Sequence, residues 1–326
     1  MLTNIIKQFP RCRLLVIGDL IADEFVYGEI ARVSREAPVM ILRYERTETM
    51  PGGAGNAAAN VAALAERAAL IGVIGRDVAG RQLTLGLRRR GVTTSGVLTL
   101  SGYATPTKTR ILAGSVHSTR QQVIRIDREP TLEQPTDFHT RLIAQLNEKI
   151  AEADAVIVSD YNYGVVSETL LAALGKASKA RAIPVVVDSR FHLRTCHGFT
   201  AATPNQAELE ALVETRLLNE VDLNTAGLQL RAQLGLSALL LTRGSEGMIL
   251  FEEGRLPYKI EAVGSKEPVD VTGAGDTVIA TFTLALAAGA SFQDAARIAN
   301  YAGGLVVMKR GTATVTREEL LASIAQ

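Results

Sequence analysis

The sequence predicts an α/β protein: a doubly wound, mainly parallel sheet with helices on both faces, and a small β-sheet lid. From about residue 136 onward, short apolar runs that end in polar residues alternate with helical segments. That alternation is typical of parallel strands joined by right-handed helical crossovers. Two stretches, about 25–48 and 105–127, alternate apolar and polar residues and predict the separate lid. No linker-like segment divides the sequence, so we expect one domain over residues 1–326.

Size and charge narrow the class of protein. The 326 residues are 47% hydrophobic and 21% charged, which is ordinary for a globular enzyme. Lys and Arg number 35 against 34 Asp and Glu, so the formal net charge is +1. Because this balance creates no strong positive field, we expect no nucleic-acid partner, and an anionic ligand must be met by local clusters.

The apolar runs and the cysteines indicate a cellular location. The sequence has no uninterrupted apolar run of ~18 residues and no apolar signal segment after Met1, so we expect neither a membrane span nor a membrane partner. Cys12 and Cys196 lie far apart, without a C-x-x-C pair. We therefore expect a reduced, cytoplasmic protein without a zinc site.

The first predicted strand covers residues 13–19, and two acids, Asp19 and Asp23, lie at its carboxyl end. Ligands of open α/β sheets bind at the carboxyl ends of the strands. Both carboxylates are therefore candidates for accepting hydrogen bonds from sugar hydroxyl groups. For Asp19 a capped turn is an equally compatible alternative.

A glycine-rich segment, Pro51-Gly52-Gly53-Ala-Gly-Asn56, precedes an alanine-rich helix predicted over 57–65. The glycines allow close backbone approach to a polar ligand, and Asn56 offers both a donor and an acceptor. A structural hinge for the lid is the alternative. The lid has an apolar face that needs cover, either over substrate or against a second subunit.

Two predicted lid strands, 107–112 and 122–128, carry the cations Lys108, Arg110 and Arg125. The alternation of the strands places these cations on or near one surface. Charge on a solvated strand face is the usual meaning of this pattern. An anionic group on the substrate would give the cluster a function.

The second half of the sequence brings polar residues to one edge of the sheet. Predicted strands end at Asp160, at Asp188 and at Thr242-Arg243-Gly244, and parallel strands end together. Asn205 opens a helix with Glu208 in its first turn. The elements predicted here are helices 138–151, 167–177 and 222–234, and strands 155–160, 183–188 and 238–244.

The most informative stretch is Asp270-Val-Thr-Gly273-Ala274-Gly275-Asp276, which leads into an apolar helix predicted over 277–288. Small residues let amide groups converge, and a helix start adds partial positive charge, so the stretch is suited to an anion. A carboxylate beside that anion is repelled by it, so its presence there indicates a function. Taking a proton from an attacking hydroxyl is such a function. Asp276 is therefore the candidate base of a phosphoryl transfer. A glycine-rich cap without chemistry is the alternative, and the absence of a Gly-Lys-Ser/Thr run disfavours a P-loop enzyme.

With these motifs in this order, the sequence resembles the ribokinase-like (PfkB) carbohydrate kinases over nearly its whole length. The similarity rests on residues 52–58 with Gly75 beyond them, on Asn205-x-x-Glu208, and on residues 270–276. Ala65 and Thr281 depart from the family pattern, and both are small residues on predicted helices. The resemblance implies a ribokinase-like kinase that uses ATP and Mg²⁺.

Within that family, Tyr27-Gly, residues 32–39, Arg125-Ile-Asp127 and residues 269–279 resemble the heptose-7-phosphate kinases of lipopolysaccharide-core synthesis, with Arg35 where Pro is usual. The implied reaction moves the γ-phosphate of ATP to the anomeric C1 hydroxyl of D-glycero-β-D-manno-heptose 7-phosphate. Bifunctional members add a nucleotidyltransferase domain, and a last helix at 317–325 predicts the stand-alone kinase. Another sugar, sugar phosphate or nucleoside as acceptor, or a non-catalytic sugar-binding regulator, remains open.

The same resemblance implies a role for each candidate residue. Asp276 is the base, and the amides of Gly273, Ala274 and Gly275 hold the transferring phosphoryl group. The remaining candidates fall into nucleotide, metal, sugar and phosphate groups: Thr242, Arg243 and Gly244 for the nucleotide; Asn205 and Glu208 for Mg²⁺ through water, with plain helix capping as the alternative; Asp19, Asp23, Gly52, Gly53 and Asn56 for the sugar; and Lys108, Arg110 or Arg125 for its 7-phosphate. Family analogy also implies a homodimer through the lid. The sequence leaves open a need for a monovalent cation such as K⁺ and the anomeric preference.

Overall fold

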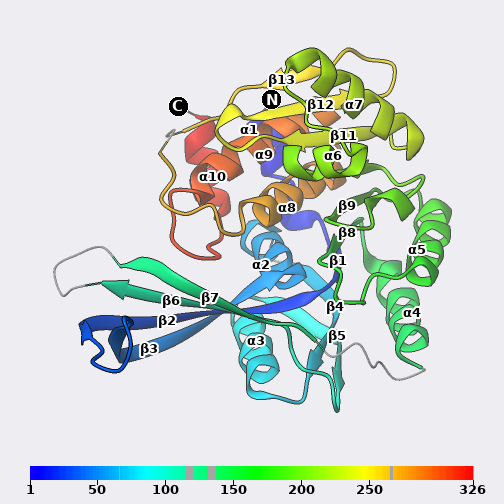
Figure 1. Ribbon diagram of the computed structural model, residues 1–326. Coiled ribbons are helices and arrows are strands. Elements are labelled where there is room, and N and C mark those ends of the chain that lie inside the picture. The colour runs from blue at the N-terminus through cyan, green and yellow to red at the C-terminus, as the bar shows by residue number, and fades with distance from the viewer. Residues whose placement is uncertain (66, 115–119, 131–136, 265–266, 326) are drawn as a thin grey trace.

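A computed structural model describes residues 1–65, 67–114, 120–130, 137–264 and 267–325 (Figure 1). Within these residues the main body is built on one nine-stranded sheet. In sheet order its strands are β13 (Tyr258–Ile260), β12 (Met248–Glu252), β11 (Ala238–Thr242), β10 (Ala201–Ala202), β9 (Val185–Ser189), β8 (Ala155–Asp160), β1 (Leu14–Gly18), β4 (Ala68–Gly75) and β5 (Val92–Leu100). Neighbours from β11 to β5 pair in parallel, which confirms the predicted doubly wound, mainly parallel sheet.

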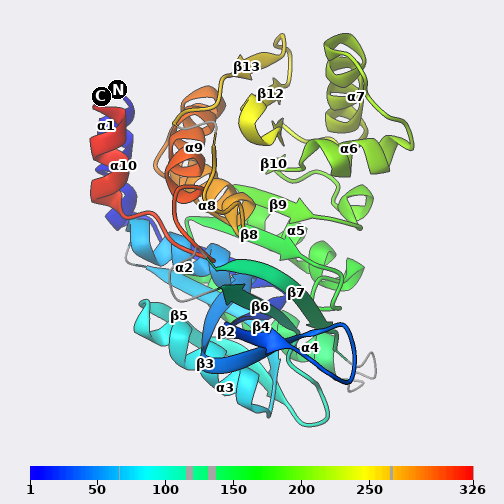
Figure 2. The same ribbon diagram turned by 60° about the vertical axis from the view of Figure 1, so that its left-hand side comes forward.

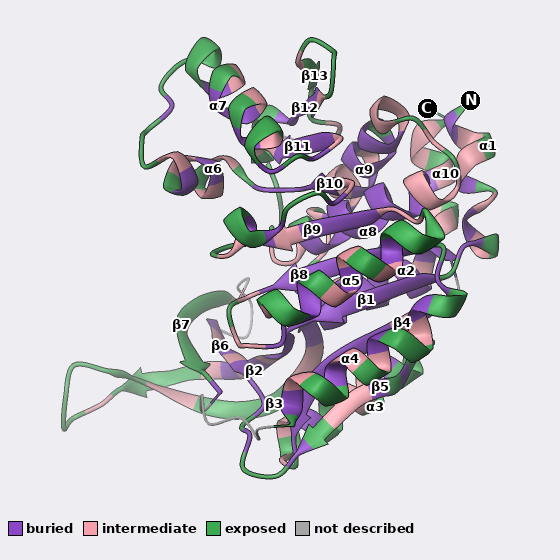
Figure 3. Cartoon of the chain, turned by 90° about the vertical axis from the view of Figure 1, so that its right-hand side faces the viewer, coloured by how far each residue is buried: buried purple, intermediate pink, exposed green. Residues whose placement is uncertain are grey.

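Helices cover both faces of this sheet because its strands are apolar on both sides. Along β1, Leu14 and Val16 join one buried core, whereas Leu15 and Ile17 join the other. The first core is covered by α1 (Leu2–Ile6), α2 (Ala54–Ala65), α3 (Val78–Arg89), α8 (Ala274–Ala287), α9 (Phe292–Val306) and α10 (Arg317–Ile324). The second is covered by α4 (Phe138–Lys149), α5 (Glu168–Arg181), α6 (Gln206–Val213) and α7 (Glu220–Gln233). Figure 3 shows the strands buried between these helices.

A second sheet projects from the main body as the predicted lid (Figures 1 and 2). Its strands, in sheet order, are β3 (Met40–Gly53), β2 (Leu20–Val33), β6 (Thr107–Gly114) and β7 (Gln121–Arg128). β2 and β6 pair in parallel, and both outer pairs are antiparallel. β2 and β3 are longer than the sequence predicted and reach back into the main body. Residues 115–119 of the expected lid lie outside the described residues.

Some elements differ from the prediction. β12 and β13 form an antiparallel edge, and α9 and β5 add further elements that the periodicity did not reveal. Short 3₁₀ turns occur at Phe9–Arg11, Ile150–Glu152, Leu193–Thr195 and Gly244–Glu246. In the part of the chain that the structure describes, no helix combines the length and apolarity that a membrane crossing requires.

The fold brings the start of α8 and the root of the lid together at the carboxyl ends of the parallel strands. There the chain leaves β1 beside β8: a Cβ on Gly18 would lie 1.9 Å from the carbonyl oxygen of Ser159. Only glycine permits that approach, and it lets β2 start immediately and carry the chain into the lid. The amino terminus of α8 and the root of the lid consequently border the same strand ends.

Candidate active site

The start of α8 forms a cradle of main-chain amides beside a buried acid. Gly273 is the N-cap of this helix, in the left-handed conformation with φ 77°, and a Cβ there would lie 2.4 Å from Nδ2 of Asn56. A Cβ on Gly275 would meet nothing within 4 Å, so this residue faces open space. Because the first amides of a helix have no partner within the helix, they point toward that space and favour an anion.

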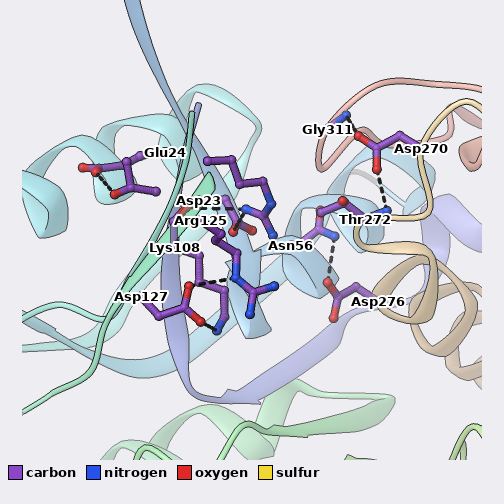
Figure 4. A network of polar contacts seen from close by, with 12 residues as sticks. Asp23, Glu24, Asn56, Lys108, Arg125, Asp127, Asp270, Thr272, Asp276 and Gly311 are labelled. Atoms are coloured by element: carbon purple, nitrogen blue, oxygen red, sulfur yellow. Dashed lines mark hydrogen bonds and ion pairs between the residues drawn. The ribbon is translucent and has the colours of Figure 1, made fainter. Parts of the chain in front are cut away.

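Asp276 lies in the first turn of α8 and is only 4% exposed. Its Oδ2 accepts a hydrogen bond from Nδ2 of Asn56 at 2.8 Å (Figure 4). Its Oδ1 accepts one from the Tyr161 hydroxyl at 3.2 Å. Burial raises the pKa of Asp276 to about 7, against the lowering effect of these two donors. A carboxylate with a pKa near neutral pH is suited to general-base catalysis.

Asn56 is held in place by a buried network within the main body. Its backbone oxygen accepts a hydrogen bond from Nδ2 of Asn60 at 3.0 Å, and Oδ1 of Asn60 accepts one from the Thr277 hydroxyl at 3.0 Å. α2 and α8 are thereby joined by polar contacts at the point where their glycine-rich starts meet. The amide of Asn56 is fixed toward the carboxylate of Asp276.

Asp23 and Arg110 form a buried ion pair at the root of the lid, between β2 and β6. Burial raises the pKa of Asp23, and the Arg110 guanidinium opposes that rise. A Cβ on Gly52 would lie 2.2 Å from Oδ2 of Asp23, so this glycine makes room for the carboxylate. Asp23 also acts electrostatically on Asp276. The acid at the root of the lid and the acid at the start of α8 are therefore electrostatically coupled.

A second charged group lies farther along the same surface of the lid. Asp127 accepts from Nζ of Lys108 at 3.1 Å and from Nε of Arg125 at 2.9 Å (Figure 4). Two cations share one carboxylate here, so the group keeps a surplus positive charge. The structure thus brings Lys108, Arg110 and Arg125 together, as predicted, but each is already paired with an acid.

Asp19 accepts hydrogen bonds from the main chain of the loop that follows β8. Its carboxylate accepts three backbone N–H groups, from Tyr161 at 2.8 Å, Tyr163 at 3.1 Å and Val165 at 3.1 Å. These bonds occupy the carboxylate and fix the 161–165 loop after β8. The structure thus shows Asp19 holding a loop that is distant in the sequence, which places Tyr161 beside Asp276, and the sugar contact of Asp19 stays a prediction.

Asn205 and Glu208 cap α6. The side chain of Asn205 accepts from the Glu208 amide at 2.9 Å, and Oε2 of Glu208 accepts from the Asn205 amide at 2.9 Å. Oε1 of Glu208 remains directed at Arg190, 3.9 Å from its Nε. Burial raises the pKa of Asp188 well above its usual range, and the carboxylates of Glu208 and Asp276 add to the effect. Among the described residues, no three acidic, histidine or cysteine side chains are grouped so that they could hold a metal ion directly. Direct coordination is therefore not built into the site, and Mg²⁺ here would be held through water, as hydrated Mg²⁺ often is.

A cavity of about 190 Å³ lies between β11, α8 and α9. Thr242 and Gly244 line it from one side, and Ala274 and Gly275 line it from the other. Arg243 does not line it, because its guanidinium is directed to Gln206 and Glu246. A contact between Arg243 and the nucleotide therefore stays a prediction. The walls that the sequence did not predict come mainly from α9 and the segment before α8: Val263, Asn300, Gly303, Gly304 and Val307.

Asp270 holds the approach to the cradle. Its Oδ1 accepts from the Thr272 amide at 2.9 Å, and its Oδ2 accepts from the Gly311 amide at 2.8 Å (Figure 4). The amide cradle is thereby tied to the loop between α9 and α10. Asp270 shapes the cradle rather than pointing into it.

Sequence reasoning missed Tyr161 and Arg190. Each comes just after an acid near the carboxyl end of a strand, Asp160 in β8 and Asp188 in β9, and that position was the available sign. The guanidinium of Arg190 lies 4.5 Å from the centre of the Tyr161 ring. Both residues border Asp276.

Comparison with known proteins defines the class that this fold and site represent. The profile of the pfkB family carbohydrate kinases matches residues 13–319, so the chain belongs to that family and is a carbohydrate kinase. The predicted family is thus confirmed. The Bifunctional protein HldE of Desulfatibacillum aliphaticivorans is 38% identical over 320 residues, and that of Geobacter metallireducens is 41% identical over 325. Each alignment covers 98% of this chain but only 64% and 65% of the respective relatives.

Solved structures confirm the ribokinase-like fold. Arabidopsis thaliana ribokinase complexed with ribose and ATP superposes with a TM-score of 0.73 at 22% identity, covering 96% of this chain and 98% of that one. Phosphofructokinase-2 from Escherichia coli in complex with potassium gives 0.76 at 21% identity, covering 97% and 99%. At these identities the similarity establishes the fold alone.

Proposed function

We propose that this kinase transfers the γ-phosphate of ATP to the anomeric C1 hydroxyl of D-glycero-β-D-manno-heptose 7-phosphate, giving the 1,7-bisphosphate for ADP-heptose and lipopolysaccharide-core synthesis. The observation that carries the proposal is Asp276, a buried acid with a pKa of about 7 beside the amide cradle of residues 273–275. The relatives named HldE support the choice of a heptose acceptor.

In this proposal Asp276 takes the proton of the attacking hydroxyl. Asn56 and Tyr161 donate to its two oxygens and keep it ionised and oriented. The amides of Gly273, Ala274 and Gly275 stabilise the charge that develops on the phosphoryl oxygens. Residues lining the cavity, including Thr242 and Gly244, hold the nucleotide. Glu208, with Asn205 beside it, would hold Mg²⁺ through water, and the ion would supply positive charge to the phosphates.

The sugar occupies the polar space between Asp276 and the root of the lid. Asp23 accepts from its hydroxyl groups, and Gly52, with Gly53 next to it, leaves room for that carboxylate. The 7-phosphate meets the surplus charge of Lys108 and Arg125, because Arg110 is committed to Asp23 inside the lid. A charge-assisted contact of this kind contributes about 1.5–3 kcal/mol.

A coupled assay of ADP release tests the acceptor. The panel contains heptose 7-phosphate in both anomeric forms, unphosphorylated heptose, ribose, fructose 6-phosphate and a nucleoside. We expect the highest kcat/KM with the phosphorylated heptose, and at least tenfold less without its phosphate. Preference for another acceptor would replace the heptose assignment, and ATP binding without transfer to any of them would indicate a regulator. Repeating the assay with K⁺ and with Na⁺ decides whether a monovalent cation is needed.

We also propose that two copies pair through the lid. β7 is exposed along its whole length and carries Val123, Ile124 and Ile126, which are 40%, 52% and 46% exposed. Apolar strand faces of this kind need cover. Sedimentation at micromolar concentration should show a dimer that Ile124→Lys converts to a monomer; a wild-type monomer would refute the pairing. Two unpaired, buried cysteines, Cys12 and Cys196, support the proposed cytoplasmic location.

A further inference from the structure

Arg190 is a cation at the centre of the candidate site that none of the roles above uses. It directly follows β9, and its side chain is 50% exposed. Burial lowers its pKa, but the acids that act on it, Glu208, Asp188 and Asp276, outweigh that effect and raise it. Its Nε lies 3.9 Å from the candidate metal residue Glu208, and its charge acts on the candidate base Asp276.

The position of Arg190 is fixed by the loop that carries it. The Ser189 hydroxyl donates to Oδ2 of Asp160 at 2.6 Å, and the ring nitrogen Nδ1 of His192 lies 3.1 Å from the same oxygen. The amide of His192 donates to the Ser189 hydroxyl at 3.0 Å. These bonds close a turn around Arg190 at the carboxyl end of the sheet, so its backbone is held in place before any ligand arrives.

The geometry also leaves the hydrogen-bonding edge of the guanidinium available. Its face lies over the Tyr161 ring, 4.5 Å from the ring centre, which is a cation–π arrangement. Stacking of this kind uses the flat face and leaves the N–H groups at the edge for another partner. Among the described residues, the one ion pair of this side chain is the contact with Glu208 at 3.9 Å, the outer limit of such a pair.

Charge identifies the partner. Asp188, Glu208 and Asp276 place three carboxylates around one guanidinium, so a nucleotide triphosphate entering this space meets repulsion unless cations offset it. A planar guanidinium edge matches two phosphate oxygens. We propose that Arg190 binds the terminal phosphate of the nucleoside triphosphate and stabilises it during transfer. This inference rests on the proposed phosphoryl transfer at Asp276, but not on the identity of the sugar.

Binding of two nucleotides, measured calorimetrically with Mg²⁺ and without sugar, tests the proposal. The probes are ADP and a non-hydrolysable ATP analogue with an imido bridge. Arg190→Gln should weaken binding of the analogue by about 10- to 100-fold and leave ADP within about twofold, because a lost charge-assisted contact has that size. Arg190→Lys keeps the charge but not the planar edge with two donors, so its affinity for the analogue should lie between those of Arg190→Gln and wild type. This variant also covers the case in which Arg190→Gln fails to fold.

A matched control is Arg13→Gln. Arg13 is also 50% exposed and pairs with a Glu at 3.5 Å, but it precedes β1 at the opposite edge of the sheet. It should leave both affinities unchanged. Equal weakening of ADP and the analogue by Arg190→Gln, or no weakening of either, would overturn the proposal. A sugar panel without turnover would refute the proposed function instead, and would leave the nucleotide comparison standing.

Discussion

Nδ2 of Asn56 donates to Oδ2 of Asp276 over 2.8 Å, although 220 positions separate the two residues in the sequence. Asn56 comes from the first glycine-rich segment, and Asp276 comes from the second. The contact means that one motif orients the base of the other, so Asn56 has a task beyond the sugar contact that the sequence suggested.

Asn56→Ala should therefore impair both stability and turnover. Asn56 is 1% exposed, and its loss leaves the buried carboxylate of Asp276 without its shorter hydrogen bond. We expect a loss of about 1–3 kcal/mol in the free energy of unfolding, measured by urea denaturation. kcat should fall by about tenfold or more. An unchanged kcat would show that the contact does not orient the base.

Tyr161→Phe isolates the second donor. Removing its hydroxyl takes away a bond that favours the ionised form of Asp276, so the pKa of that acid should rise above about 7. The charged groups facing it, Asp23 and Arg190, are unchanged. The acid limb of the kcat/KM profile should move to higher pH, with activity recovered near pH ~9.

The matched control for that profile is Tyr301→Phe on α9, which changes a partly buried tyrosine packed against the core. It should leave the limb in place. If the acid limb of Tyr161→Phe stays where it is in the wild type, the Tyr161 hydroxyl does not influence the pKa of Asp276.

Arg125→Ala tests the phosphate group of the substrate. Its side chain is 51% exposed and shares Asp127 with Lys108, so it can be removed without breaking a buried pair. We expect KM for the phosphorylated sugar to rise about tenfold, while KM for ATP and for the unphosphorylated sugar stays constant. Arg43 lies near the lid tip and is 72% exposed, so the control Arg43→Ala should leave all three KM values unchanged.

Arg110→Ala should behave differently, because it leaves the buried carboxylate of Asp23 without its ion-pair partner. We expect a loss of about 3–5 kcal/mol in unfolding free energy, with both substrates affected. A selective change in KM for the phosphorylated sugar alone would instead assign the 7-phosphate to Arg110.

The sequence predicted the fold well because parallel strands are short apolar runs with a regular spacing, as at 155–160 and 238–242. It also predicted the amide cradle, because glycines at 273 and 275 leave the main-chain amides of a helix start open to a ligand. It did not predict the antiparallel direction of β12, since alternation carries no information about which way a strand runs. The sequence also could not show whether a carboxylate faces a ligand or the backbone. In the structure Asp19 accepts from the backbone and holds a loop. Partners such as Tyr161 depend on long-range packing that no local pattern encodes.

The raised pKa of Asp276 also predicts a cost in stability. A carboxyl group whose folded pKa of about 7 exceeds its ordinary 3.8 stabilises the fold fully below pH 3.8, and that contribution is lost as pH rises toward 7. Asp276→Asn removes the burial of charge, so the variant should be more stable than wild type at pH ~8, by about 1–4 kcal/mol at most. The difference should shrink at pH ~4.5. Thermal unfolding at the two pH values measures it, and a variant less stable at the higher pH would contradict the burial of a charged base.

Turnover by Asp276→Asn is the most direct test of the kinase mechanism, with Asp294→Asn as the control. Asp294 lies in the first turn of α9, as Asp276 does in α8, but faces Ser291 and Arg297. In the ADP-release assay with heptose 7-phosphate, Asp276→Asn should fold normally and lose roughly 10²–10⁴-fold in kcat, whereas Asp294→Asn should keep it. Near-wild-type turnover by Asp276→Asn would contradict its assignment as the base.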